Sequence, residues 1–521
     1  MSSLDWWVIG GYLLGMLVLA VYLGWRQGSR TDYYLGGNKL PGWTLATSIV
    51  ATQCSTNSLL GAPAFVGFIA GGGMLWLQYE LAVPLAMLLL CFAFLPIRRA
   101  NVISIYAFLE QRLGLASRML ASGCFLLFRG VATGVTVYGV GSVVALIADI
   151  SFDMAILILM GVTIAYDLIG GMRAVVISDV IQMVLLTGAV ILALVFLYDP
   201  LTIHFSELTH RTPALVNDWG ISSGNSYGFW PMFFGGLFLY MAYYGCDQSQ
   251  AQRLLSAESP KQTQKVLALN GLLRFPLVLA YCFVGLGLAA YALEHSDFVA
   301  SLPLTEAGKP NYNLVFPAFV ALEFAPGLAG LAIVGLFAAA MSSIDSALNS
   351  LSASTLEDFV ARFKPLPEKH LFTLSKLVTL GWGLFAVAFS YQVERIAPTV
   401  LEAINKIGSM ANGPLLGLFG IALFLPVIGQ RSAILGFIGG LLVNYIVFAF
   451  LPSVSWLWWN VTGFVGCILT ALLSAVFILG TTSVRNMAID RPAMAVATSI
   501  KWQLCLMTAL ILAVGSALTF L

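Results

Sequence analysis

Charged residues are scarce in this chain. Only 9% of its 521 residues are Asp, Glu, Lys or Arg, whereas 59% are hydrophobic. A water-soluble protein of this length with so little charge would expose very large apolar patches. The mean hydropathy of +0.91 points the same way. The composition excludes a soluble protein and indicates an integral membrane protein.

Histidine and paired cysteine are missing where they would support chemistry. The four histidines fall in loops between apolar segments, and the seven cysteines occur singly, without a CxxC pair. A membrane-embedded enzyme would need a nucleophile with a base, or a set of metal ligands, and the apolar segments offer no histidine for either. We therefore expect a protein that is not an enzyme.

Long basic or acidic tracts are also absent. The formal net charge is +1, and the basic residues are scattered through short loops. Nucleic-acid binding calls for a clustered basic surface, so no nucleic-acid partner is expected. Nothing in the sequence indicates an obligate protein partner. The expected partners are a small solute, an ion and the lipid bilayer.

What the chain does contain is about fourteen apolar segments, each long enough for the ~20 helical residues that cross a bilayer core. Their approximate cores are 5–24, 42–68, 73–96, 119–149, 153–170, 174–197, 229–252, 266–293, 318–356, 371–392, 397–427, 432–452, 458–480 and 500–520. We expect one all-α polytopic membrane domain over residues 1–521. The first segment lacks a cleavage site and is expected to be a retained helix.

Lys and Arg are distributed unevenly along this predicted bundle. With the N-terminus outside, 20 of the 25 basic residues fall in inner loops or at inner helix ends, Arg253 and Arg274 among them. Cytoplasmic loops are enriched in such residues. The sequence therefore predicts a multi-pass protein of the cell membrane, plasma or bacterial inner, with both termini outside.

Polar residues interrupt two of the apolar segments. Residues 51–61 place a run of polar side chains in the middle of the second segment, and residues 407–414 end on Gly413-Pro414. Irregular backbone at this depth occurs where it lines a cavity, and proline frees a carbonyl. Broken helices near the bilayer midplane bind substrate and ions in secondary transporters. We expect a helix break at each position.

A third segment, residues 335–354, carries hydroxyls and a carboxylate at membrane depth. A charge there costs at least ~2.5 kcal/mol, so it usually faces a cavity, a partner or an ion. Hydroxyl and carboxylate oxygens suit a hard cation. Ser342, Asp345 and Ser346 share one helical face because they stand at i, i+3 and i+4. The segment predicts a cation site.

Five motifs, in order, resemble those of the sodium:solute symporter family. They begin with Asp32-Tyr-Tyr-Leu-Gly-Gly…Leu40-Pro-Gly-Trp43, continue with Gly170-Gly-Met-Arg-Ala-Val-Val-Ile-Ser-Asp179-Val-Ile-Gln182 and Asp247-Gln-Ser-Gln-Ala-Gln-Arg253, and close with residues 335–354 and Gly413-Pro-Leu-Leu-Gly-Leu. Members of this family carry sugars, proline, sialic acid and monocarboxylates with sodium. The resemblance implies a LeuT-like core of ten helices in a 5+5 inverted repeat. Its parts are an extra N-terminal helix at 5–24, repeats at 42–197 and 229–427, and three C-terminal helices at 432–520.

The resemblance also implies a principal sodium site. It would combine the backbone carbonyls of Ala51, Cys54 and Ala339 with the hydroxyls of Ser342 and Ser343. Carbonyls freed by a broken helix and two serine hydroxyls give about five oxygen ligands of low charge, which suits a monovalent ion that is released in each cycle. Na⁺ is the expected coupling ion.

A second cation site is implied by some family members, in which Asp179 joins hydroxyls of the 335–354 segment. Here the group would be Asp179, Ser342, Asp345 and Ser346. Asp345 departs from those members, which have a hydroxyl at its position. Two neighbouring carboxylates could hold sodium, share a proton or point apart. A structural or gating role for Asp179, and solvation of both carboxylates at the interface, are the alternatives.

Candidate substrate residues lie in and near the first break. Ser55, Thr56, Asn57 and Ser58 are predicted to form the inner wall of a pocket, with Gln78 from the next segment. Tyr243 stands at the position of an aromatic gate in sugar-carrying members, and the alternative is a core aromatic.

Arg129 lies some nine residues into the fourth segment. Its guanidinium is predicted to pair with a carboxylate such as Glu80, with an anionic substrate as the second interpretation and snorkelling to the inner face as the third.

These features predict sodium-coupled import of a small polar organic solute by alternating access. The solute class stays open among sugars, sialic acid, carboxylates and amino acids. Proton coupling through Asp179 and Asp345 in a transporter of the same fold is the alternative.

Overall fold

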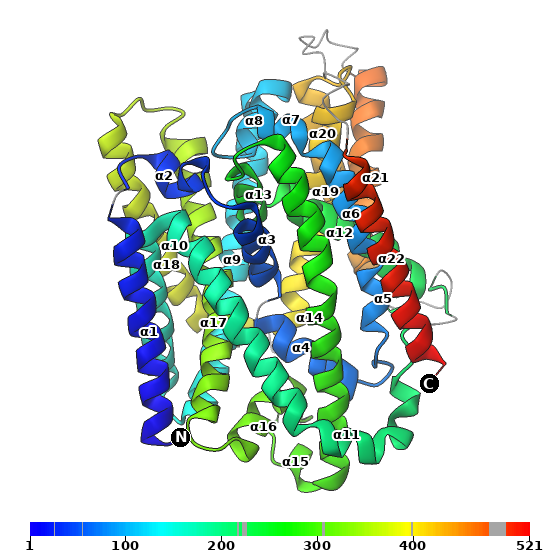
Figure 1. The fold of residues 1–521 in the computed structure, drawn as a ribbon. Helices are drawn as coiled ribbons and strands as arrows, with labels where there is room; N and C mark the ends of the chain where they lie inside the picture. Colours follow the sequence, from blue (N-terminus) through cyan, green and yellow to red (C-terminus); the bar gives the residue numbers. More distant parts are fainter. Residues whose placement is uncertain are drawn as a thin grey trace.

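The structure is a computed structural model that describes residues 1–25, 27–54, 56–215, 218–220, 227–304, 308–396, 400–478 and 496–520, with the backbone alone for 57, 394–396, 400–407 and 478. The described residues form a helical bundle (Figure 1). The helices, in chain order, are α1 Ser3–Gly24, α2 Arg30–Leu35, η1 Gly36–Asn38, α3 Gly42–Gln53, α4 Thr56–Gly67, α5 Trp76–Glu80, α6 Ala82–Ala93, α7 Leu95–Arg99, α8 Tyr106–Leu113, α9 Leu115–Ala148, α10 Phe152–Phe196, α11 Tyr198–His204, η2 Phe205–Arg211, η3 Pro231–Gly235, α12 Gly236–Cys246, α13 Gln248–Leu255, α14 Pro260–Glu294, α15 Asp297–Ala300, η4 Tyr312–Leu314, α16 Val315–Glu323, α17 Leu328–Ser354, η5 Thr355–Val360, α18 Glu368–Ile396, α19 Val400–Phe424, α20 Gln430–Phe450, α21 Trp458–Leu473, η6 Ser474–Ile478 and α22 Thr498–Thr519.

Among the described residues, ten helices are long and apolar enough to cross a membrane, and three apolar helices are shorter. The difference from about fourteen predicted segments has local causes. Segment 42–68 is divided between α3 and α4, whereas segments 153–170 and 174–197 are joined in the single helix α10. Segment 318–356 is divided between α16 and α17. The all-helical membrane fold is confirmed, with a span count that depends on how these breaks are treated.

The bend in α10 shows why two segments merged. Gly171 has φ +51° and ψ −158°, outside the helical region, so the helix changes direction there. A Cβ at this position would lie 2.7 Å from the Tyr33 ring. Glycine is the residue that tolerates both this backbone and this close approach. The bend therefore lets α10 pass beneath α2.

The predicted break at residues 51–61 is confirmed. Helix α3 ends at Gln53, Cys54 has φ −80° and ψ +55°, and α4 begins at Thr56. The turn leaves backbone carbonyls without the partners that a continuous helix supplies. This break lies against α17 in the middle of the bundle.

The predicted break at residues 407–414 is wrong. Helix α19 runs without interruption through Gly413 and Pro414. Proline at 414 cannot donate to the carbonyl of Met410, and the Asn444 side chain of α20 donates to that oxygen instead, at 2.9 Å. Gly413 packs directly on α21, because a Cβ there would lie 2.4 Å from the Asn460 carbonyl. Neighbouring helices thus satisfy the freed group and keep the helix intact.

Replacing Asn444 with alanine is expected to destabilise the protein by about 1–3 kcal/mol, because the Met410 carbonyl then stays buried without a donor. The double variant Asn444→Ala with Pro414→Ala restores a backbone N–H at 414 and should recover part of that loss. Thermal unfolding in detergent measures both. Equal losses in the single and double variants would contradict this explanation of the continuous helix.

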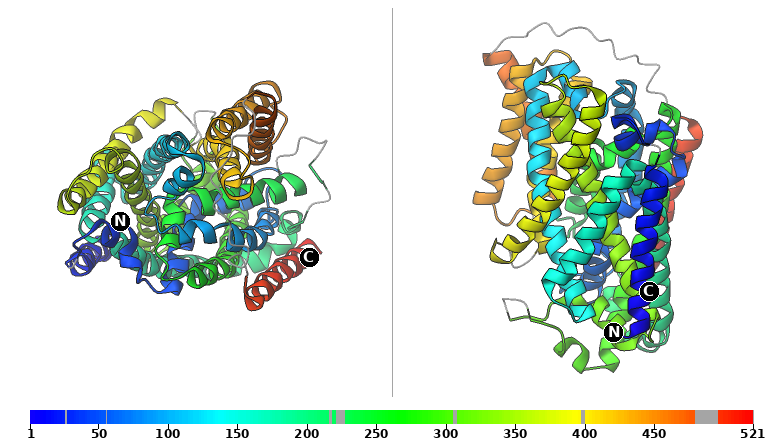
Figure 2. Two further views of the ribbon diagram at one scale, coloured as in Figure 1. Left: turned by 90° about the horizontal axis from the view of Figure 1, so that it is seen from above. Right: turned by 90° about the vertical axis from the view of Figure 1, so that its left-hand side faces the viewer.

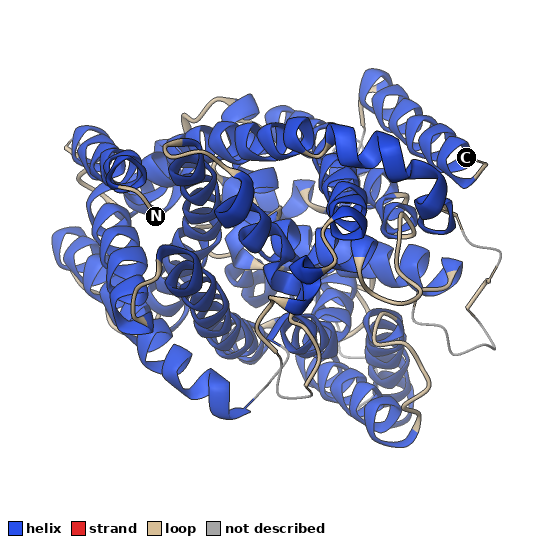
Figure 3. Ribbon diagram, turned by 90° about the horizontal axis from the view of Figure 1, so that it is seen from below, coloured by secondary structure: helices blue, strands red, loops and turns tan. Residues whose placement is uncertain are grey.

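Both ends of the chain lie at one end of the bundle, with α11, α15 and α16, whereas α2, α7 and α8 lie at the opposite end (Figure 1). We call these the terminal end and the far end. Helices α20 and α21 stand on one side of the molecule and α1 on the other (Figure 2). Viewed from the terminal end, the molecule consists of helices and connecting loops (Figure 3). Helix α17 contacts both α3 and α4.

Candidate ion and substrate site

The break in α3–α4 and the middle of α17 hold each other through hydroxyl groups. The Ser342 hydroxyl lies 3.1 Å from the Ala51 carbonyl and 3.1 Å from the Ala339 carbonyl. Three of the five predicted sodium ligands therefore meet at one hydroxyl. Ser342 is 1% exposed, so water does not compete for these oxygens.

The other two predicted ligands lie beside this group. The Ser343 hydroxyl donates to the carbonyl of Thr52, the residue after the predicted ligand Ala51, at 3.0 Å. The Cys54 carbonyl accepts from the Tyr281 hydroxyl at 3.2 Å. Uncharged oxygens from two helices are thus gathered at one break, which is the ligand set that a hard monovalent cation prefers.

The group predicted as a second cation site contains a residue that the sequence analysis placed at an inner helix end. Arg253 of α13 is 1% exposed and pairs with the fully buried Asp179, with Nη2 3.0 Å from Oδ2. The same guanidinium donates to the hydroxyls of Ser48 and Ser346. A protein cation therefore lies between Asp179 and Ser346, where the prediction expected a bound ion.

Asp345 lies next to this pair and is fully buried. Its Oδ1 accepts from the Ser346 hydroxyl at 3.1 Å, and its Oδ2 has no hydrogen-bond partner among the described residues. On the neighbouring helix α10, Gln182 donates to the Tyr12 hydroxyl of α1 at 3.2 Å. The four predicted residues are close together, with Arg253 inserted among them.

A cavity of about 700 Å³ adjoins the break and extends to the loop residues at 309–313, at the terminal end. Of the predicted substrate residues, Ser58, Arg129 and Tyr243 line it. Two others point elsewhere. Thr56 donates to the Leu336 carbonyl at 3.2 Å, and Gln78 donates to the Tyr227 carbonyl at 2.7 Å.

Two of the predicted wall groups, Ser55 and the side chain of Asn57, lie outside the described residues. The wall of the cavity instead includes neighbours that the sequence analysis did not name as substrate residues. These are Thr52 and Gln53 at the break, together with Phe65, Trp76, Tyr79, Asp247 and Arg274.

The sequence analysis expected Arg129 to pair with a carboxylate such as Glu80. The structure shows that Arg129 does not pair with Glu80. Glu80 holds Arg274 in a bidentate pair, with Nε–Oε2 and Nη2–Oε1 distances of 2.7 and 2.8 Å. Arg129 faces Asp247 across a longer gap of 3.6 Å. Its Nε has no hydrogen-bond partner among the described residues. Two nitrogens of Arg274 are therefore held by a carboxylate, with its Nη1 unpartnered among the described residues, whereas Arg129 has only the longer contact to Asp247.

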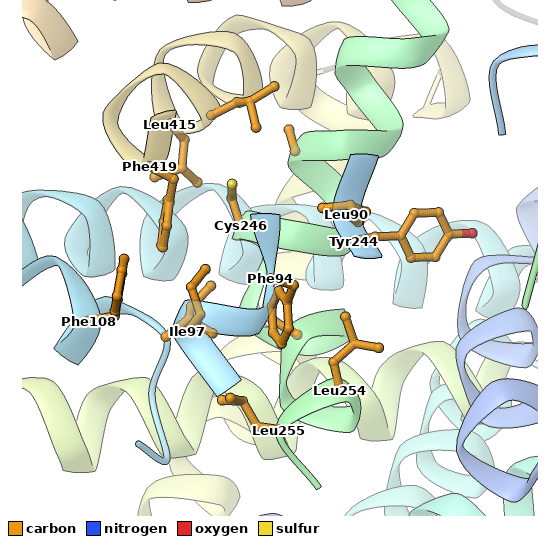
Figure 4. Close-up of a cluster of buried hydrophobic side chains, with 14 of the residues drawn as sticks. Leu90, Phe94, Ile97, Phe108, Tyr244, Cys246, Leu254, Leu255, Leu415 and Phe419 are labelled. Atoms are coloured by element: carbon orange, nitrogen blue, oxygen red, sulfur yellow. The ribbon is translucent and has the colours of Figure 1, made fainter. Parts of the chain in front are cut away.

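An apolar cluster, here called the apolar seal, packs beside the far-end helices α7 and α8 (Figure 4). One buried cluster contains Leu90 of α6, Phe94 directly after α6, Phe108 of α8, Leu255 of α13 and Phe419 of α19. Figure 4 shows side chains from these helices gathered in one place. None of these five residues lines the 700 Å³ cavity.

Ion pairs hold the far end together beyond the apolar seal. Arg118 of α9 bridges Asp358 and Glu110 at 2.8 and 2.6 Å, and Asp358 is fully buried. Arg30 of α2 pairs with Glu357 at 2.7 Å. Removing one partner of a buried pair leaves an uncompensated charge, so such contacts fix one arrangement of the helices that carry them. In the described structure these ion pairs join α2, α8, α9 and η5 at the far end.

A model of the sodium:solute symporter family matches residues 33–440. The chain belongs to this family. The symporter is 30% identical to the sodium/sialic acid symporter SiaT of Proteus mirabilis (strain HI4320) over 447 residues, which cover 83% of this chain and 86% of the relative. It is 27% identical over 468 residues to the sodium-dependent multivitamin transporter of Oryctolagus cuniculus, with 85% and 70% covered.

A solved structure confirms the fold of the symporter. The substrate-bound, outward-open structure of a Na⁺-coupled sialic acid symporter superposes with a TM-score of 0.82 at 24% identity, over 94% of this chain and all of that chain. The LeuT-like fold that the sequence predicted is confirmed. The symporter is a multi-pass membrane transporter and not an enzyme, and it carries a small organic solute together with sodium.

Sequence reasoning missed the partners of the buried charges in this symporter. Arg253 was counted among the inner basic residues, although it lies inside the bundle. The available indication was the balance of charge, because a buried Asp179 requires a nearby cation. Asp167 of α10 is also fully buried, and the sequence analysis did not name it.

Proposed function

We propose that the protein imports a small organic carboxylate with sodium, and that Arg129 binds the carboxylate. The supporting observation is its guanidinium in the wall of a 700 Å³ cavity, loosely paired at 3.6 Å and with Nε unpartnered among the described residues. A planar guanidinium matches a carboxylate in a bidentate geometry. A solute carboxylate would complete hydrogen bonds that Asp247 leaves unmade.

Arg274 lines the same cavity but serves a different purpose in this proposal. Its bidentate pair with Glu80, backed by a 2.7 Å contact from Nη2 to the Tyr240 hydroxyl, neutralises its charge within the protein. Aromatic rings of Trp76, Tyr79 and Tyr243 supply apolar and polar surface for the rest of the solute. Such a mixture of apolar walls and few polar groups is typical of small-molecule sites.

The proposed sodium site consists of the carbonyls of Ala51, Cys54 and Ala339 and the hydroxyls of Ser342 and Ser343. Ser343 supports coupling between ion and solute, because its side chain both lines the cavity and bonds the Thr52 carbonyl at the break. An ion that fixes the break would also fix the wall of the cavity. By linkage, each ligand then increases the affinity of the other by the same factor.

The second cation site, formed by Asp179, Ser342, Asp345 and Ser346, stays a prediction. Arg253 already neutralises Asp179 there, at 3.0 Å. A further ion would depend on Asp345, whose Oδ2 has no partner among the described residues.

In the proposed orientation the terminal end faces outside the cell, in agreement with the distribution of Lys and Arg. The cavity then extends towards the outside and the apolar seal faces the cytoplasm. Helices 42–197 and 229–427 would form the two inverted repeats that move relative to one another, with 5–24 and 432–520 outside them. Sodium enters first, the solute follows, and opening of the far end releases both inward.

Thermal stability of the purified protein with candidate solutes tests the proposed substrate class. Sialic acid, lactate and pyruvate are compared with glucose and galactose, each in sodium and in choline. We expect one of the carboxylates to raise the unfolding temperature in sodium only, since a ligand stabilises the state that binds it. Stabilisation by a sugar, with none from the acids, would contradict the role given to Arg129.

A further inference from the structure

Helix α17 presents two different faces to the interior. Ser343, Ile344 and Ala347 line the solute cavity. Another face carries polar residues at intervals of three or four, and none of them lines that cavity. This polar stripe consists of Ser342, Asp345, Ser346, Asn349 and Ser352, and each is at most 1% exposed.

The stripe leads from the proposed sodium site towards the far end, and buried charges accompany it. Asp179 and Asp167 of α10 and Arg253 of α13 are at most 1% exposed. Together with Asp345 they give three carboxylates and one guanidinium among the described residues. An unpaired charge away from water is costly. The balance of charge along the stripe therefore favours cations.

Asp167 of α10 contacts the stripe at Asn349, about two helical turns beyond Ser342. Its Oδ1 accepts from the Asn349 amide at 3.2 Å, and its Oδ2 has no hydrogen-bond partner among the described residues. Gln252 donates to the Asn349 carbonyl oxygen at 2.7 Å, and its own Oε1 is likewise unpartnered in the described structure. Two buried oxygen atoms, one of them charged, are thus available beside a hydrogen-bonded chain of amides.

Helix α2 covers this group at the far end. The Tyr34 hydroxyl lies 2.8 Å from the Ser352 hydroxyl, and the Tyr34 carbonyl accepts from Gln252 at 2.7 Å. The Tyr33 hydroxyl reaches the backbone carbonyl of Asp167 at 3.4 Å. The six-residue helix α2, Arg30–Leu35, thus covers this group together with α18. The Tyr33 hydroxyl lies 3.1 Å from the Thr379 hydroxyl of α18, and the Ser375 carbonyl of α18 accepts from Ser352. Movement of α2 would expose the group to the cytoplasm.

We infer that Asp167, with the side-chain oxygens of Gln252 and Asn349, forms a second station for the sodium ion on its way to the cytoplasm. The ion leaves the break along the polar stripe, on a different face of α17 from the solute. Carboxylate and amide oxygens are suitable ligands for a hard cation. This inference rests on the proposed sodium-coupled import and assigns a release route to it.

Net uptake and exchange in proteoliposomes separate this station from the primary site. Net uptake requires sodium to leave inward, whereas solute exchange with equal sodium on both sides does not. The probe is radiolabelled sialic acid, or lactate or pyruvate if either gives the larger sodium-dependent thermal shift. In Asp167→Asn, we expect net uptake to fall about tenfold, as for a slowed release step, and exchange to change less than about twofold. Asp153→Asn, an exposed carboxylate on the same helix, is the control.

The pair Asp167→Asn with Asn349→Asp provides a rescue. It exchanges the two groups of one hydrogen bond, keeps an acceptor for Gln252 and restores the carboxylate. We expect net uptake to return to within about threefold of the parent, as expected when a release step is restored. Failure of this rescue in a protein with normal exchange would overturn the station.

Three further results would overturn it. Unchanged net uptake in Asp167→Asn, with a working parent, rejects the release route and leaves sodium coupling intact. If the effect of Asp167→Asn on net uptake depends on internal pH and not on internal sodium, Asp167 binds a proton and not the sodium ion. A parent without sodium-dependent uptake rejects both the proposed function and the station.

Discussion

Replacing Ser342 and Ser343 together with alanine is expected to abolish the stabilisation of the protein by sodium. The two hydroxyls contact the freed carbonyls of Ala51 and Thr52 at 3.1 and 3.0 Å, so they connect both halves of the proposed site. A specific ion at a hundred times its dissociation constant stabilises the native state by about 2.7 kcal/mol. The double variant should lose this difference between sodium and choline entirely.

Thermal unfolding at equal ionic strength measures the effect. The difference between the two cations is the relevant quantity, because each substitution also removes a hydrogen bond worth about 1 kcal/mol in either salt. Ser350→Ala is the matched control, since Ser350 bonds a carbonyl of its own helix, that of Ala347, at 2.9 Å. If the double variant were stabilised by sodium as much as the parent, the ion would bind elsewhere.

Replacing Arg129 with glutamine is expected to weaken carboxylate binding by about 2–4 kcal/mol, or roughly 30- to 1,000-fold in Kd. The amide cannot supply a charged, bidentate donor, and it leaves Asp247 as the charged group nearest the solute. Arg129→Lys keeps the charge without the planar fork and should fall between the parent and Arg129→Gln. Sodium stabilisation without solute should survive in both variants, because Arg129 does not contact the proposed ion ligands.

Solute-dependent thermal shifts, measured in saturating sodium, give the affinities. Arg112→Gln is the control, because Arg112 lies over the Phe108 ring at the far end, away from the cavity. Equal affinity in Arg129→Gln and the parent would mean that the solute is uncharged or bound by Arg274. A loss of sodium stabilisation in Arg129→Gln would point to a misfolded cavity instead of a lost contact.

Local polarity was a reliable guide to one break and not to the other. Residues 51–61 place several polar side chains in succession, and the structure has a break there because α17 supplies hydroxyls to the freed carbonyls. Gly413-Pro414 also frees a carbonyl, but Asn444 satisfies it and the helix continues. The donor comes from a helix some thirty residues away in sequence, which a local pattern does not contain.

The partners of the buried charged residues were likewise not predictable from local sequence patterns. Sequence reasoning recognised that Arg129 and Asp179 need partners, and it chose Glu80 for the first and no cation for the second. The partners are Asp247 and Arg253. Pairing between helices depends on how they pack and rotate, and helical spacing along one chain segment does not fix that. The proposed sodium ligands rest on a broken helix and two serines, and both features are visible in the sequence.

Uptake of a radiolabelled carboxylate into proteoliposomes, under a sodium gradient and separately under a proton gradient without sodium, tests the coupling most directly. The probe is sialic acid, lactate or pyruvate, whichever gives the sodium-dependent thermal shift. Sodium-coupled symport predicts accumulation with the inward sodium gradient and none with the proton gradient alone. Accumulation driven by protons in the absence of sodium would contradict it and would transfer the coupling to the buried carboxylates of Asp179 and Asp345.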